Sequence, residues 1–70
     1  MSDYVADKVN GVIHQGLGER AGDVQMTVKN GVVTLRGKVA SEAQKQELEN
    51  QIMALPGVNQ VDNQLTITQE

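Results

Sequence analysis

Apolar and polar residues alternate through residues 23–39, on both sides of the dipeptide Asn30-Gly31. This alternation predicts two β-strands, because successive side chains of a strand point to opposite faces of its sheet. Asn-Gly between two strands predicts a two-residue type I′ turn, whose central residues both need a positive φ angle. Such a turn pairs Lys29 with Val32 and sets the register of the hairpin. One face then carries Val24, Met26, Val28, Val33, Leu35 and Gly37, and the other carries Gln25, Thr27, Lys29, Val32, Thr34 and Arg36.

Apolar side chains recur at helical spacing from residue 5 to residue 17, which predicts an amphipathic helix. Ser2 can cap its start, and Gly16 or Gly18 can end it, because glycine tolerates the left-handed conformation that follows many helices. We expect a polar loop over residues 19–22, before the hairpin begins. The predicted buried stripe of this helix consists of Val5, Val9, Val12, Ile13 and Leu17.

A second helix is predicted after the hairpin, where Ser41 and Gln44 have the spacing of a capping box. Pro56 ends this helix, because the residue before a proline avoids the α-helical region. The side chains expected on its buried side are Leu48, Ile52 and Leu55, with Ala43 and Ala54 beside them. The side chains expected to face away are Gln46, Glu49, Asn50 and Met53.

Residues 61–67 alternate again, with Asn63 as the one polar member of an apolar set formed with Val61, Leu65 and Ile67. They predict a third strand, which the helical crossover makes parallel to the second. The predicted fold is α+β: an αββαβ two-layer sandwich with a three-stranded mixed sheet and two helices on one face. We expect a single domain over residues 1–70, with a core over about residues 3–68.

The composition excludes several kinds of site. The chain has no cysteine, so it can form neither a disulfide nor a thiolate metal site, and its one histidine, His14, lacks the partners that a metal needs. A net charge of −3 and a single aromatic residue, Tyr4, argue against a nucleic-acid partner. We therefore expect no metal, no cofactor and no nucleic acid.

Catalysis is not expected either. A core built from 70 residues leaves no room for a deep active site, so we predict no enzyme, no catalytic residue and no small-molecule substrate. Asp3 and Asp7 share the polar side of the first helix with His14, and solvation is the expected state of all three. The sequence contains no run of about 20 apolar residues, so no membrane span is predicted. The start of the chain does not have the pattern of a signal peptide.

The glycines do not form a phosphate-binding fingerprint. Turn geometry accounts for Asn30 and Gly31, and for the pair Pro56 and Gly57. At Gly37 we expect close packing between a helix and the sheet. These five residues are therefore predicted to be structural.

Three segments together resemble the BON domain family. They are VKNGVVTLRGKV over residues 28–39, SEAQ over residues 41–44 and LPGVNQVDNQL over residues 55–65, and the similarity extends from about residue 5 to residue 67. The resemblance implies the αββαβ layout described above and a non-catalytic module. It also implies a role in bacterial envelope or osmotic-stress proteins, with phospholipid or a neighbouring protein as the partner.

Two groups of residues are candidates for contact with anionic lipid headgroups. Lys29 and Arg36 project from the polar sheet face with Lys38 near the strand end, and each basic residue near a charged membrane contributes about 1 kcal/mol. Basic residues that only keep an exposed strand soluble are the alternative. By analogy with family members that contact lipid through a helix, one flank of the first helix is the second candidate, with Tyr4, Lys8, Gly11 and Gln15. A Tyr4 that closes the edge of the core is the alternative there.

The leading hypothesis is a module that associates with anionic phospholipid at the cell envelope. The first alternative is a protein-docking module that uses an exposed edge strand or the second helix. A weaker alternative is potassium sensing by backbone carbonyls around residues 19–23. We expect the periplasm or envelope if the chain belongs to a longer exported protein, and the cytoplasm if it is complete.

Overall fold

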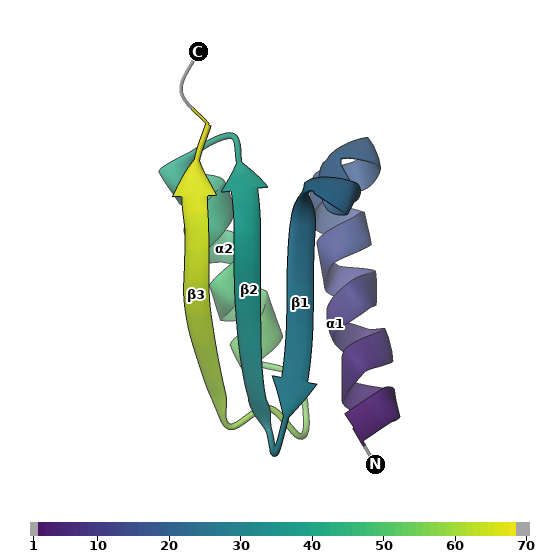
Figure 1. Ribbon diagram of the computed structural model, residues 1–70. Helices are drawn as coiled ribbons and strands as arrows, with labels where there is room; N and C mark the ends of the chain where they lie inside the picture. Colours follow the sequence, from purple (N-terminus) through teal and green to yellow (C-terminus); the bar gives the residue numbers. More distant parts are fainter. Residues whose placement is uncertain (1, 69–70) are drawn as a thin grey trace.

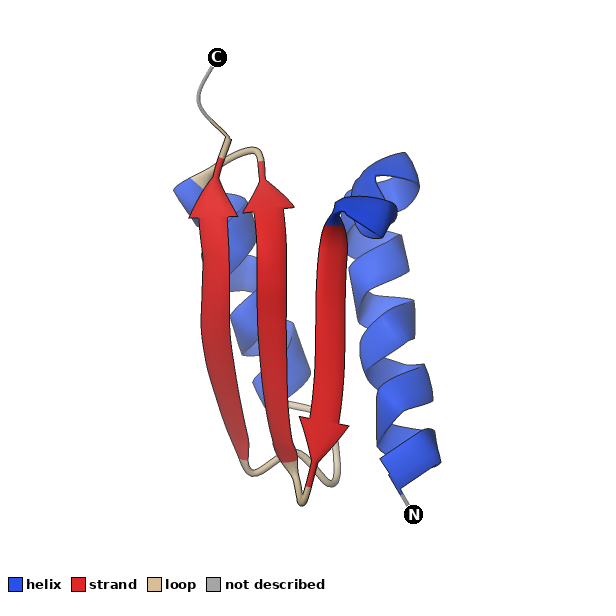
Figure 2. Cartoon of the chain, in the orientation of Figure 1, coloured by secondary structure: helices blue, strands red, loops and turns tan. Residues whose placement is uncertain are grey.

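Two α-helices lie on one side of a three-stranded β-sheet, whose other side they leave open (Figures 1 and 2). This arrangement comes from a computed structural model that describes residues 2–68. The elements follow in the order α1 (Ser2–Leu17), the 3-10 helix η1 (Gly18–Asp23), β1 (Val24–Lys29), β2 (Val32–Val39), α2 (Glu42–Met53) and β3 (Gln60–Ile67). The predicted α+β class and αββαβ layout are confirmed.

The hairpin has the predicted turn and register. Asn30 and Gly31 have φ angles of 53° and 79°, as a type I′ turn requires. Lys29 pairs with Val32, and the antiparallel pairing continues to Val24 and Gly37. β3 lies on the other side of β2 and parallel to it, so the sheet order is β1-β2-β3 and the sheet is mixed.

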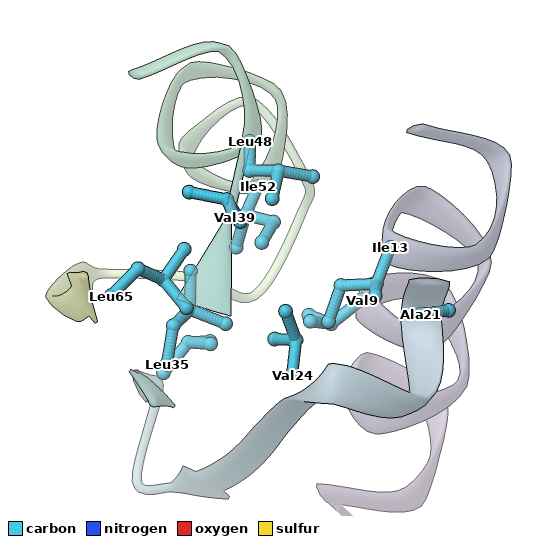
Figure 3. Close-up of a cluster of buried hydrophobic side chains, with 10 residues drawn as sticks. Val9, Ile13, Ala21, Val24, Leu35, Val39, Leu48, Ile52 and Leu65 are labelled. Carbon is cyan, nitrogen blue, oxygen red and sulfur yellow. The ribbon is translucent and has the colours of Figure 1, made fainter. Parts of the chain in front are cut away.

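The core lies between the sheet and the two helices. Figure 3 shows side chains from α1, α2 and all three strands converging there. Among the strands, α1 packs mainly on β1 and α2 packs mainly on β3, and the two helices also pack against each other. The buried side chains are Val9, Ile13, Ala21, Val24, Val33, Leu35, Val39, Leu48, Ile52 and Leu65.

Hydrogen bonds at the start of α2 match the predicted cap. The Gln44 amide N–H donates to the Ser41 hydroxyl oxygen at 3.1 Å, and the Gln44 side-chain oxygen accepts from the Ala40 amide at 3.0 Å. α1 ends at Leu17, and Gly18 follows in the left-handed region with a φ of 59°. The side chains of Ser2 and Asp3 lie outside the described part of the structure, so the predicted cap of α1 stays a prediction.

Three expectations about local structure are wrong. Residues 19–22 belong to the helix η1 rather than to a polar loop, because Ala21 is buried and draws the segment against the core. Ala43 on α2 and Ala54 directly after it are exposed rather than inward-facing. Glu49 was expected to face away, but it is half-buried, and its carboxylate accepts a hydrogen bond from the Asn63 side chain of β3.

Gly37 is required for a different reason from the one predicted. Its φ of 133° is open only to glycine, and a Cβ atom there would lie 2.9 Å from the Cα atom of Val24 and closer still to the Asp23 carbonyl oxygen. The crowding therefore comes from the backbone at the start of the neighbouring strand, and not from a helix.

Candidate binding surfaces

The uncovered side of the sheet, called the open face below, consists of alternate residues of all three strands. Its members are Gln25, Thr27 and Lys29 of β1, Val32, Thr34, Arg36 and Lys38 of β2, and Gln60, Asp62, Gln64 and Thr66 of β3. Three of these residues are cations and one is a carboxylate, so the open face carries a net charge of +2. The whole chain carries −3, so the remaining residues together carry −5.

The three basic residues share the open face but do not form one compact patch. Lys29 lies beside the turn, where it pairs with Val32. Lys38 lies six residues beyond Val32 along β2, which separates it from Lys29 by about 20 Å at the rise of a β-strand. Arg36 and Lys38 are two residues apart and are the only close pair, because the same strand presents both on one face about 6.6 Å apart.

Arg36 is held in place by residues of β3. Its Nε atom donates to the Gln64 side-chain oxygen at 3.0 Å, and the Gln64 amide nitrogen donates to an Asp62 carboxylate oxygen at 2.8 Å. A guanidinium only donates and a carboxylate only accepts, so the Gln64 amide has one orientation that satisfies both. The Thr66 hydroxyl donates to the Gly37 carbonyl oxygen at 3.1 Å, which ties the same two strands together.

A shallow depression lies on the open face between β1 and β2. It has a volume of about 150 Å³ and is lined by Gln25, Met26, Thr27, Thr34 and Arg36. Since Met26 points its side chain to the core face, it contributes backbone, and the polar side chains form the walls. The depression is thus lined by backbone and by the side chains of polar residues, one of which is a cation.

The helical candidate surface lies in the other layer of the molecule. Tyr4, Lys8, Gly11 and Gln15 are all exposed on α1. Tyr4 is 58% exposed, so it does not close the edge of the core. The Lys8 ammonium lies 5.4 Å from the centre of the Tyr4 ring, at the distance of a cation–π contact. The sheet separates this flank from the open face, so the structure does not bring the two groups together (Figure 1).

The predicted turn residues meet at one end of the molecule. The Gly31 carbonyl oxygen accepts from the backbone amides of Asn59 at 2.7 Å and Gln60 at 3.2 Å, which joins the hairpin turn to the segment before β3. Gly57 has a φ of 92°, and a Cβ atom there would lie 2.9 Å from a Val5 methyl group of α1. Asn30, Gly31, Pro56 and Gly57 therefore build this end of the molecule.

Asn63 has a role that the alternation pattern did not reveal. Its side-chain nitrogen donates to the Lys45 carbonyl oxygen at 3.2 Å and to a Glu49 carboxylate oxygen at 3.0 Å. Its side-chain oxygen accepts from the backbone amide of Leu65 at 3.2 Å. This Leu65 amide points away from β2, so Asn63 both ties β3 to α2 and occupies a donor on the free edge of the sheet.

The comparison with protein families decides what the chain is. The family model for the BON domain matches residues 2–69, which is nearly the whole chain. The chain belongs to the BON domain family. BON domains are in general non-catalytic binding modules that are linked to phospholipid and to the bacterial envelope. No curated protein matches the chain.

Other kinds of site receive no support in this BON domain. Within residues 4–68, whose side chains the structure describes, no three His, Asp or Glu side chains are grouped so that they could hold a metal ion, and His14 is exposed. No helix over these residues has the length and apolar character needed to cross a bilayer. Residues 19–23, the predicted cation-sensing segment, lie in η1, where the Ala21 carbonyl oxygen already accepts from the Val24 amide. Potassium sensing by this segment stays a prediction.

Proposed function

We propose that this BON domain is a non-catalytic module that associates with anionic phospholipid surfaces through the open face of its sheet. The carrying observation is the division of charge, with +2 on the open face and −5 on the remaining residues of the chain. An anionic surface attracts the open face and repels the rest, so the charges orient the molecule as well as bind it. The family association with phospholipid supports the same partner.

The close pair Arg36 and Lys38 is expected to contribute most. Two cations near a charged membrane contribute about 2 kcal/mol together, which corresponds to a roughly thirtyfold change in affinity. Binding should weaken with added salt, because exposed charges are screened over about 8 Å at physiological ionic strength. Lys29 lies at the far end of the face and adds to the same attraction.

The experiment measures cosedimentation with vesicles of phosphatidylglycerol and, separately, of phosphatidylcholine. We expect binding to the anionic vesicles alone, and a loss of about thirtyfold in the double variant Arg36→Gln/Lys38→Gln. The matched control is Arg20→Gln/Lys45→Gln, which removes the same charge outside the open face and should bind nearly as well as the parent. Equal losses in the two variants, or equal binding to both vesicles, would refute the proposal.

A second variant separates the two candidate surfaces. Tyr4→Ala/Lys8→Gln removes the ring and the cation of the α1 flank without altering the open face. We expect it to retain most of its vesicle binding. A larger loss there than in Arg36→Gln/Lys38→Gln would move the lipid-contact surface to α1.

Protein docking is the second candidate function, and one observation favours a particular edge for it. In a two-residue hairpin, alternate residues of β1 point their backbone groups away from β2, and Met26 and Val28 are among these. β3 has its outward Leu65 amide occupied by Asn63, whereas no described side chain bonds to the outward groups of Met26 and Val28. A docking partner that adds a strand would therefore choose β1. Sedimentation that changes with concentration, and is unaffected by Asn63→Ala, would support this function.

A further inference from the structure

We propose that the depression between β1 and β2 is a binding site for a single phosphate group, with the Arg36 guanidinium as its main ligand. This inference deepens the proposed function, because it assigns one chemical group to one place on the open face. A general attraction between charges needs no such place. The phosphate site and the general attraction to anionic lipid can therefore be tested separately.

The guanidinium is prepared for an anion by its contact with β3. Its Nε atom is occupied by the Gln64 side-chain oxygen at 3.0 Å. The two terminal nitrogens carry the remaining four N–H donors, and together they can form a pair of hydrogen bonds with one oxyanion. Gln64 is itself held by Asp62 at 2.8 Å. The Arg36 side chain therefore loses less conformational freedom when it binds an anion than a free arginine side chain would.

Other residues that line the depression carry further hydrogen-bond donors. Gln25 is the cross-strand partner of Arg36, and Thr27 is the cross-strand partner of Thr34. The two pairs are neighbours on one face, so the four side chains stand at the corners of a rectangle of about 5.5 by 6.6 Å. The residues that line this hollow of about 150 Å³ thus carry two hydroxyls, an amide and a guanidinium.

Donors on several sides suit a tetrahedral oxyanion better than a planar carboxylate. A phosphate group presents three oxygens in different directions, whereas a carboxylate presents two in one plane. No carboxylate lines the depression, and the nearest one on this face is Asp62, opposite Thr34 on β3. Asp62 is turned toward Gln64, so it orients the arginine but also limits the affinity for a dianion.

The same chemistry occurs in a soluble phosphate compound and in a lipid headgroup, and the experiment separates the two sources. The backbone amide signals of the isotope-labelled protein are followed by NMR at constant ionic strength. The probes are inorganic phosphate, methyl phosphate and acetate, and then bicelles that contain phosphatidic acid. We expect saturable shifts at Gln25, Thr27, Thr34 and Arg36, with a dissociation constant on the order of 1–10 mM for methyl phosphate.

Three variants test the role of the hydrogen-bonding groups. Arg36→Lys keeps the charge but removes the paired donors, and should weaken methyl phosphate binding by about tenfold. Thr34→Val keeps the shape and removes one hydroxyl, and should weaken it by about threefold. Lys29→Gln removes a charge about 13 Å from Arg36 along the sheet, and it should change the affinity for methyl phosphate by less than about twofold.

Each result has one meaning. Weak shifts that do not saturate, equal responses to acetate and methyl phosphate, or equal losses in Arg36→Lys and Lys29→Gln would overturn the site and leave the vesicle result untouched. Saturable phosphate binding without binding to phosphatidic acid bicelles or anionic vesicles would support the site for soluble phosphate compounds and refute the lipid proposal. Shifts of the same four amides with methyl phosphate and with the bicelles would support both.

Discussion

Leu35 and Arg36 are neighbours on β2, yet they belong to opposite faces of the sheet with opposite tasks. Leu35 is 0% exposed and lies at the centre of the core, whereas Arg36 is exposed beside the polar depression. The pleat of the strand separates them, because successive side chains point to opposite sides. The core face of the sheet thus stabilises the fold, whereas the open face remains available for binding. The four substitutions below test this division.

Gly37→Ala should have the largest effect, because the core face admits no side chain at this position. The φ of 133° costs about 1–3 kcal/mol for a residue with a Cβ atom, and the overlap with the Asp23 and Val24 backbone adds about 1–3 kcal/mol. Thermal and urea unfolding followed by circular dichroism would measure the loss. Gly11→Ala is the matched control, since no atom lies within 4 Å of the added Cβ and alanine favours the helix by up to about 1 kcal/mol. Equal stability of the two variants would contradict the close approach of β1 and β2.

Leu35→Ala should reduce the free energy of unfolding by about 2–5 kcal/mol, because it opens a cavity in the most buried part of the core. The control is Met53→Ala on α2, where the side chain is 45% exposed and a change within about 1 kcal/mol is expected. Urea unfolding measures both variants. Similar losses would mean that α2 packs differently on the sheet.

Asn63→Ala should cost about 1–3 kcal/mol, because three hydrogen bonds between β3, α2 and the sheet edge are lost. Asn50→Ala is the control on the exposed side of α2, where one hydrogen bond from Gln46 is lost and the change should stay within about 0.5 kcal/mol. Chemical denaturation again provides the comparison. A cost no greater than that of Asn50→Ala would show that the bridge does not stabilise the fold.

Arg36→Gln/Lys38→Gln should have the smallest effect on the fold. Both side chains are exposed, so the free energy of unfolding should change by less than about 0.5 kcal/mol. The same variant is expected to lose most of its vesicle binding, so stability and binding separate on the two faces. A large loss of stability would mean that the open face also holds the fold, and the division between the faces would be lost.

The candidate surface was only partly predictable from the sequence. The hairpin register placed Thr27, Thr34 and Arg36 on one face, because both strands and their turn are local in the chain. The contributions of Asp62 and Gln64 were missed, because they depend on the parallel register between β2 and β3, and a helix of twelve residues separates these strands. No local pattern records how such a crossover aligns two strands.

Turn chemistry, helix caps and hydrophobic periodicity act between residues a few positions apart, so the amino-acid sequence alone predicted the two α-helices, the three strands, the hairpin register and the family, but not the helix η1. The packing of the layers was needed to show that the β1 backbone crowds Gly37 and that Asn63 joins β3 to α2. Each of these facts is a contact or a distance between residues far apart in the chain. Such contacts follow from how the layers pack, and side-chain alternation along one strand carries no information about them.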